Sequence, residues 1–171
     1  MTSTEERPAV TGERADLIEA LDRHRYFLRF AVRGLTDEQA LARPTVSALC
    51  LGALIKHVAA TEATWVRFIR GGAAAMGNDP DAWAREWRVE PGETLDGLLV
   101  QYEAVARDTD DLVATLPDLD AAHPLPQAPW FEPGATWSAS RVLLHIIAET
   151  AQHAGHADIL RESIDGQKTM G

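Results

Sequence analysis

Four long segments with helical periodicity constrain what this chain can fold into more than any other feature of its sequence. Apolar residues recur at helical spacing in residues 13–32, 47–70 and 94–116, and again from Ser138 or Ser140 to Ser163. Breaks rich in glycine and proline separate these segments, and no stretch shows the sustained alternation that is typical of strands. We therefore predict an all-α fold, a four-helix bundle with long crossover loops.

Local signals predict where these helices begin and end. Gly34 follows the first helix as its stop, and Gly166 lies beyond the end of the fourth. Ser47 or Thr45 is expected to cap the second helix, because a hydroxyl at this position accepts a hydrogen bond from a free backbone amide of the first turn.

The connections between the predicted helices carry weaker signals. Residues 35–40 look like a single capped turn, and Pro80 is expected to begin a short helix within the long connection after the second helix. Two tryptophans there, Trp83 and Trp87, suggest that this connection docks on the bundle. Prolines punctuate residues 117–133, where we expect a covering loop without regular structure.

Size, charge and the single cysteine limit the kind of protein. A chain of 171 residues suits one compact domain, which we assign to residues 13–166, with a flexible N-terminal tail at 1–12 and a C-terminal tail at 167–171. The net charge of -10 opposes phosphates, so we expect neither nucleic acid nor an anionic membrane as a partner. Cys50 has no second cysteine to pair with, which fits a reducing, cytoplasmic location, and no apolar run predicts a signal peptide or membrane span.

One turn of the fourth predicted helix carries two potential metal ligands. Glu149 and His153 are four residues apart, so their side chains lie on one helix face, and they flank an apolar stripe of Val142, Ile146 and Leu160. A carboxylate oxygen and an imidazole nitrogen in this arrangement can bind one divalent cation. The alternative is an ordinary pair on a solvated helix face. A third ligand has to come from elsewhere in the chain.

His57 in the second predicted helix is a candidate for that third ligand. It borders the apolar arc that contains Leu54 and Val58, while charged side chains occupy the opposite side of the helix. His57 is thus positioned to meet Glu149 and His153 across the bundle, and such a set leaves an open coordination position on a zinc-like ion. Spacing alone does not distinguish a ligand here from a histidine packed in the core.

Three stretches of the sequence resemble the DinB-like metalloprotein superfamily. They are residues 54–65, the turn at residues 35–40, and the segment from His145 to Gly166. Within the last stretch, the run HAGHADILRESIDG at residues 153–166 is similar to a mainly actinobacterial, mycothiol-dependent branch of that superfamily. The resemblance covers nearly the whole chain and implies a four-helix bundle that binds a metal through one residue of the second helix and two of the fourth.

Those ligand positions correspond to His57, Glu149 and His153 in this sequence. Many members of the superfamily carry histidine where this chain has Glu149. The His/Glu/His set also resembles the zinc site of mycothiol-dependent maleylpyruvate isomerases, and Zn²⁺ is the expected metal, with Ni²⁺ or Mn²⁺ as alternatives. Those isomerases carry an additional C-terminal domain, so we do not expect their reaction here.

The resemblance also implies a function. Superfamily members with an assigned activity are mostly transferases or isomerases that use mycothiol, bacillithiol or glutathione, and mycothiol is the thiol expected here. We expect a metal-dependent transferase for detoxification or biosynthesis, which activates this thiol as a metal-bound thiolate for attack on an electrophilic substrate. A metal-dependent hydrolase with the same ligands and a non-catalytic metal-binding bundle are the alternatives. Apolar residues at the helix edges are compatible with a homodimer.

Other residues near the predicted site have more than one interpretation. His145 and His156 are each a supporting residue, a substitute ligand or polar surface, and we favour a supporting role for His145. Glu62 falls on the apolar arc of the second helix and is expected to be paired with Arg161 or another basic side chain. Three aromatic residues near the start of the fourth helix either form a wall for a substrate or pack the loop onto the bundle: Trp130, Phe131 and Trp137.

Overall fold

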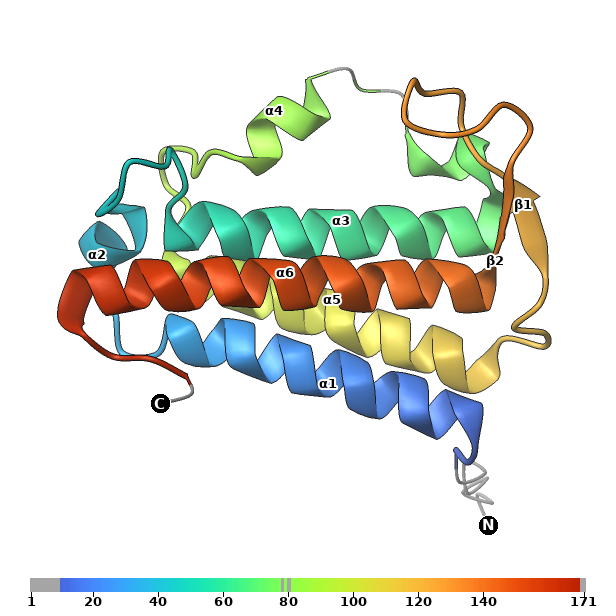
Figure 1. Ribbon diagram of the computed structural model, residues 1–171, viewed down its shortest axis with the longest axis horizontal. Coiled ribbons are helices and arrows are strands. Elements are labelled where there is room, and N and C mark those ends of the chain that lie inside the picture. Colours follow the sequence, from blue (N-terminus) through green and yellow to red (C-terminus); the bar gives the residue numbers. More distant parts are fainter. Residues whose placement is uncertain (1–9, 78, 80, 170–171) are drawn as a thin grey trace, which may run out of the picture.

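The four long helices are present in the computed structural model, which describes residues 10–77, 79 and 81–169. They are α1 (Glu13–Ala31), α3 (Leu51–Gly71), α5 (Leu95–Thr115) and α6 (Ala139–Asp165) (Figure 1). The shorter elements are α2 (Asp37–Leu41), the 3-10 helix η1 (Ala73–Met76), α4 (Ala82–Glu86), β1 (Ala122–Pro124) and β2 (Thr136–Ser138). The predicted all-α bundle is confirmed. Residues 1–9 of the predicted N-terminal tail and 170–171 of the C-terminal tail lie outside the described residues.

Most predicted helix ends agree with the structure because local side chains define them. The Ser138 hydroxyl accepts a hydrogen bond from the Arg141 amide and caps α6, and Gly166 ends that helix in the left-handed conformation at φ 78°. Thr36 and Gln39 form a reciprocal capping box at α2, the predicted single turn. The short helix expected to begin at Pro80 is α4, which begins at Ala82, and Pro80 itself lies outside the described residues.

The directions of the helices require a long crossover. α1 and α6 run the same way, since the Ser140 hydroxyl donates to Glu13 at one end of the pair and Arg161 donates to the Ala31 carbonyl at the other. α3 and α5 are also parallel to one another and antiparallel to that pair (Figure 1). The chain must therefore return along the whole length of α3 before α5 begins, and this return carries α4 along the outside of α3.

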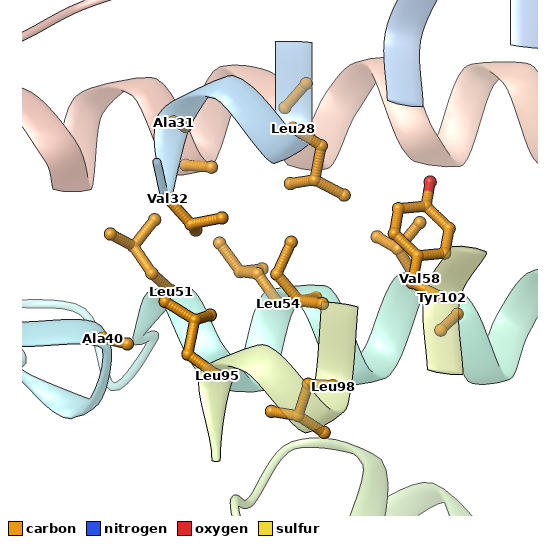
Figure 2. Packing of buried hydrophobic residues seen from close by; sticks show 14 of the residues in the cluster. Leu28, Ala31, Val32, Ala40, Leu51, Leu54, Val58, Leu95, Leu98 and Tyr102 are labelled. Carbon is orange, nitrogen blue, oxygen red and sulfur yellow. The ribbon is translucent and has the colours of Figure 1, made fainter. Parts of the chain in front are cut away.

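Two apolar clusters fill the bundle, one toward each end. The first is built around Leu28, Leu51, Leu54 and Leu98, whose side chains interdigitate in Figure 2. The second contains, among others, Leu21, Phe68, Val113, Leu143 and Ile146. Between them each long helix contributes a buried polar residue: Arg25, Glu62, Thr109 and Thr150. The middle of the bundle is thus a polar layer between two apolar ones.

The predicted start of the second long helix is wrong by four residues. α3 begins at Leu51 rather than at Ser47, and Cys50 in extended conformation precedes it. The Thr45 hydroxyl accepts from the Ser47 amide, and the Ser47 hydroxyl accepts from the Leu49 amide. Both hydroxyls thus bond to amides two residues ahead, forming local turns that compete with helix capping.

The loop over residues 117–133 is not wholly irregular, which corrects the prediction for this segment. β1 lies within it and pairs antiparallel with β2, with His123 opposite Trp137. Each strand has three residues, too few to show an alternating pattern in the sequence. The short ladder joins the loop to the start of α6. No helix in the described part of the chain has the length and apolar character needed to cross a membrane.

Candidate metal centre

Packing of α3 against α6 brings the three predicted ligands together. One ligand atom each from His57, Glu149 and His153 lies within 4.8 Å of the other two. The imidazole centroids of His57 and His153 are 4.9 Å apart. Both histidines are buried, and Glu149 is half-buried. Two imidazoles and one carboxylate therefore meet at the middle of the α3–α6 pair.

Each of the two imidazoles has one ring nitrogen engaged by a neighbour outside the trio. His57 Nδ1 lies 3.3 Å from Glu86 Oε2, and His153 Nδ1 lies 3.3 Å from His156 Nδ1. His153 Nε2 lies 3.6 Å from Glu149 Oε2. Partners of this kind fix the orientation of the imidazole ring in metal sites, and the second ring nitrogen then remains for the metal.

Glu149 is held in its ionised form. Its interaction with His153 is the main cause that lowers the pKa of this carboxyl, and the nearby His145 and His57 act in the same direction. Partial burial opposes the shift without reversing it. A carboxylate that is ionised at neutral pH is ready to bind a cation.

Trp87 forms a wall beside the two imidazoles. Its ring stacks on His57 with a centroid separation of 3.8 Å and an interplanar angle of 20°, and it meets the edge of His153 at 5.6 Å. Its Nε1 is buried and has no hydrogen-bond partner among the described residues. The predicted docking of this connection is correct for Trp87. It is wrong for Trp83, which is 68% exposed and contacts Trp87 from outside.

His145 and His156 do not join the group of ligand atoms, although both lie next to it. His156 contacts His153, as described above. His145 packs edge-on against Trp65 and Trp137, with centroid separations of 4.9 and 5.2 Å. Burial lowers the pKa of His145, while the charge of Glu149 opposes that shift. His145 therefore influences Glu149 through charge and belongs by packing to the aromatic cluster.

The polar layer of the bundle contains Glu62, which is paired with a basic side chain as predicted. Glu62 bonds Arg25 of α1 rather than Arg161, and the Thr109 hydroxyl donates to it at 2.6 Å. Arg25 also donates to Asp110 at 2.8 Å. Both Arg25 and Glu62 have fully buried side chains. The apolar pattern of a single helix could not identify this partner, because the residue that faces Glu62 depends on how α1 packs against α3.

Comparisons with known proteins bear on the family and the fold of this chain. A family model described as mycothiol-S-transferase matches residues 16–166. The chain belongs to the mycothiol-S-transferase family. This confirms the resemblance to the mycothiol-dependent branch of the DinB-like superfamily. Among curated proteins none matches the sequence of this chain. The crystal structure of a conserved protein from Enterococcus faecalis is similar with a TM-score of 0.64 at 15% identity, over 92% of this chain and 100% of that one, which shows a shared fold alone.

Within the run at residues 153–166, the part that follows His156 has a structural role. Arg161 is buried and donates to the carbonyls of Ala31 and Arg33 at 2.9 Å each. It also pairs with Asp165 at 2.9 Å. Arg161 thereby satisfies free carbonyls at the end of α1 and ties α6 to it. This part of the run supports the frame that holds the site and lies away from the ligands.

The donor set of this mycothiol-S-transferase family member fits a divalent transition metal. Imidazole nitrogen and carboxylate oxygen are both ligands of Zn²⁺, and metal–ligand distances of about 2.0–2.2 Å place ligands roughly 3–4 Å from one another. The three ligand atoms lie up to 4.8 Å from one another, so small side-chain movements would bring them to the separations around a bound ion. His57, Glu149 and His153 are the residues that would hold the ion.

The sequence did not single out Glu86, which contacts the candidate ligand His57, or Arg25, which pairs with Glu62. Glu86 lies beside His57 although it belongs to a connection whose charges look like ordinary surface residues. Arg25 falls in the apolar stripe of α1 between Leu21 and Leu28, and both it and Glu62 are charged residues at apolar helix positions. That pattern is a detectable signal for a buried ion pair. No comparable signal marks Glu86.

Proposed function

We propose that this protein is a metal-dependent thiol transferase that uses mycothiol as its cosubstrate and an electrophilic small molecule as its substrate. Zn²⁺ is the proposed metal, with Ni²⁺ or Mn²⁺ as alternatives. The observation that carries the proposal is the meeting of His57, Glu149 and His153 in a chain that belongs to the mycothiol-S-transferase family. A bound divalent cation lowers the pKa of a coordinated thiol, which makes the nucleophilic thiolate available at neutral pH.

The residues of the site support this role through their number and charge. Three protein ligands are the set found in catalytic zinc sites, which keep a further position for a substrate. Glu149 adds a negative charge that a third histidine would not supply. It strengthens the binding of a dication and weakens its Lewis acidity, and a thiolate held there keeps more of its nucleophilicity.

Trp87 stacks on His57 and covers one face of this imidazole. In the net reaction the thiol loses its proton and its sulfur forms a bond to the electrophilic carbon. The substrate then either releases a leaving group or takes up the proton. Cys50 is free and buried, which is compatible with the reducing, cytoplasmic location that we propose.

A conjugation assay tests the proposal. Purified protein is incubated with chlorodinitrobenzene in the presence of mycothiol, of glutathione or of no thiol, before and after removal of metal by a chelator. We expect conjugation that requires both mycothiol and metal, that is lost in His153→Ala, and that is retained in His24→Ala, a histidine of α1 outside the site. Hydrolysis of an ester without any thiol would favour a hydrolase. Metal binding without turnover of either kind would favour a binding protein.

A further inference from the structure

The crossover between α3 and α5 brings a carboxylate to the outer side of a candidate metal ligand. Glu86 is the last residue of α4, and its Oε2 lies 3.3 Å from Nδ1 of His57. The His57 side chain is 8% exposed and that of Glu86 is 20% exposed. An ionised carboxylate only accepts hydrogen bonds, so Nδ1 of His57 is the donor in this contact. A neutral His57 then carries its lone pair on Nε2.

Three other contacts fix the segment that carries this carboxylate. Trp87, the next residue, stacks on the same imidazole at 3.8 Å. Lys56, on the neighbouring position of α3, donates to the carbonyl of Arg88 at 2.9 Å. Val89 packs so closely on α3 that a Cβ added to Gly52 would lie 3.1 Å from its Cγ2. Several contacts therefore fix the backbone segment that carries the Glu86 carboxylate beside His57.

A comparison within the same connection shows why this contact differs from a surface ion pair. Arg85 pairs with Asp79, and both side chains are about half exposed. Such pairs contribute little, because solvent screens them. Glu86 instead faces a buried ring whose orientation decides which nitrogen is available. A carboxylate in this position raises the basicity of the opposite nitrogen and fixes the tautomer.

We propose that Glu86 is a positioning residue for the metal site. It holds His57 in the tautomer with the proton on Nδ1 and thereby leaves Nε2 as the metal ligand. The role of Nε2 rests on the proposed function, whereas the tautomer is a property of the protein alone. The crossover between α3 and α5 thus contributes directly to the centre that α3 and α6 form.

The first test uses the metal-free protein. Two-bond proton–nitrogen spectra of ¹⁵N-labelled histidines, recorded at about pH 8, well above the ordinary histidine pKa of about 6.5, report the tautomer of each ring, and His57→Ala assigns its signal. We expect Nδ1–H in the wild type and in Glu86→Gln, which keeps an acceptor oxygen. Glu86→Ala should shift His57 toward the Nε2–H form that imidazole favours in water. Glu90→Ala, an exposed position of the same connection, is the control. An Nε2–H signal in the wild type, or no change in Glu86→Ala, would overturn the proposal.

The second test measures metal binding directly. Competition with a chromophoric chelator gives the zinc affinity of each variant, and we expect a loss of about 10- to 100-fold in Glu86→Ala with no change in Glu90→Ala. Equal affinity of Glu86→Ala and wild type would refute the positioning role. A wild type that binds no metal would instead refute the proposed function, and with it the role of Nε2, while the tautomer measurement still decides whether Glu86 orients His57.

Discussion

Replacement of Arg25 by methionine is expected to destabilise the protein more than replacement of its partner Glu62. In Arg25→Met the Glu62 carboxylate stays fully buried with the Thr109 hydroxyl as its remaining partner. Removing one member of such a pair costs about 3–5 kcal/mol of unfolding free energy. In Glu62→Met the guanidinium keeps Asp110 at 2.8 Å and Asp22 at 3.3 Å, side chains that are 31% and 59% exposed. We therefore expect a smaller cost of about 1–3 kcal/mol.

The two single variants and the double variant form a cycle that tests this reasoning. Urea unfolding followed by tryptophan fluorescence gives the free energies, and an unchanged slope shows that the unfolded state is comparable. The double variant removes both buried charges and should recover most of the loss seen in Arg25→Met. A loss of about 3–5 kcal/mol corresponds to a fall in Tm of roughly 6–20 °C for a chain of this size. The reasoning fails if Glu62→Met costs as much as Arg25→Met.

The further predictions concern two glycines, an arginine near the end of α6 and a surface ion pair. Gly155→Ala should stabilise the protein by about 0.5–1 kcal/mol, because a Cβ there meets no atom within 4 Å. Gly72→Ala should destabilise it, since φ is +70° and the new Cβ would lie 3.3 Å from a histidine ring of β1. Chemical unfolding of these two glycine variants checks whether the stability rises in the first and falls in the second. Arg161→Met should lower the free energy of unfolding by about 2–4 kcal/mol, because its hydrogen bonds to the Ala31 and Arg33 carbonyls are lost. Elemental analysis of this variant should show an unchanged metal content. The hydrogen bonds from Arg70 lower the pKa of Asp108. The stability that this pair adds is therefore present above the unfolded pKa of about 3.9 and is lost as pH falls through the folded pKa. At neutral pH the free energies of unfolding of wild type and Asp108→Asn should differ by less than about 1 kcal/mol. Unfolding curves recorded in acid should show this difference disappear.

Features that depend on neighbouring residues were predictable from the sequence. The periodicity that predicts the long helices is local, and so is the four-residue spacing that places Glu149 beside His153. The Ser138 cap and the Gly166 stop are equally local. Selecting His57 as the third member needed the family resemblance in addition, because its spacing within the helix is compatible with an ordinary core residue.

Features that depend on distant contacts, or on which of two local hydrogen bonds a hydroxyl makes, were not predictable. The start of α3 was misplaced because Ser47 bonds to the nearby Leu49 amide, which the sequence does not distinguish from a helix cap. The sequence predicted a basic partner for Glu62 and left its identity open, with Arg161 as one candidate, and the packing of α1 supplies Arg25. Glu86 approaches His57 only because the crossover returns along α3. In the last two cases the deciding interaction joins elements whose relative placement no local pattern encodes.

The metal content of the purified protein tests the central claim most directly. Elemental analysis of wild type, His57→Ala, Glu149→Ala and His153→Ala, with His24→Ala as the matched control, gives the ions bound per chain. We predict about one divalent ion per chain in wild type and control, and a loss of most of it in each of the three variants, because two remaining ligands bind a dication weakly. A wild type that contains no metal and takes up neither zinc, nickel nor manganese would contradict the account, and so would variants that keep the wild-type content.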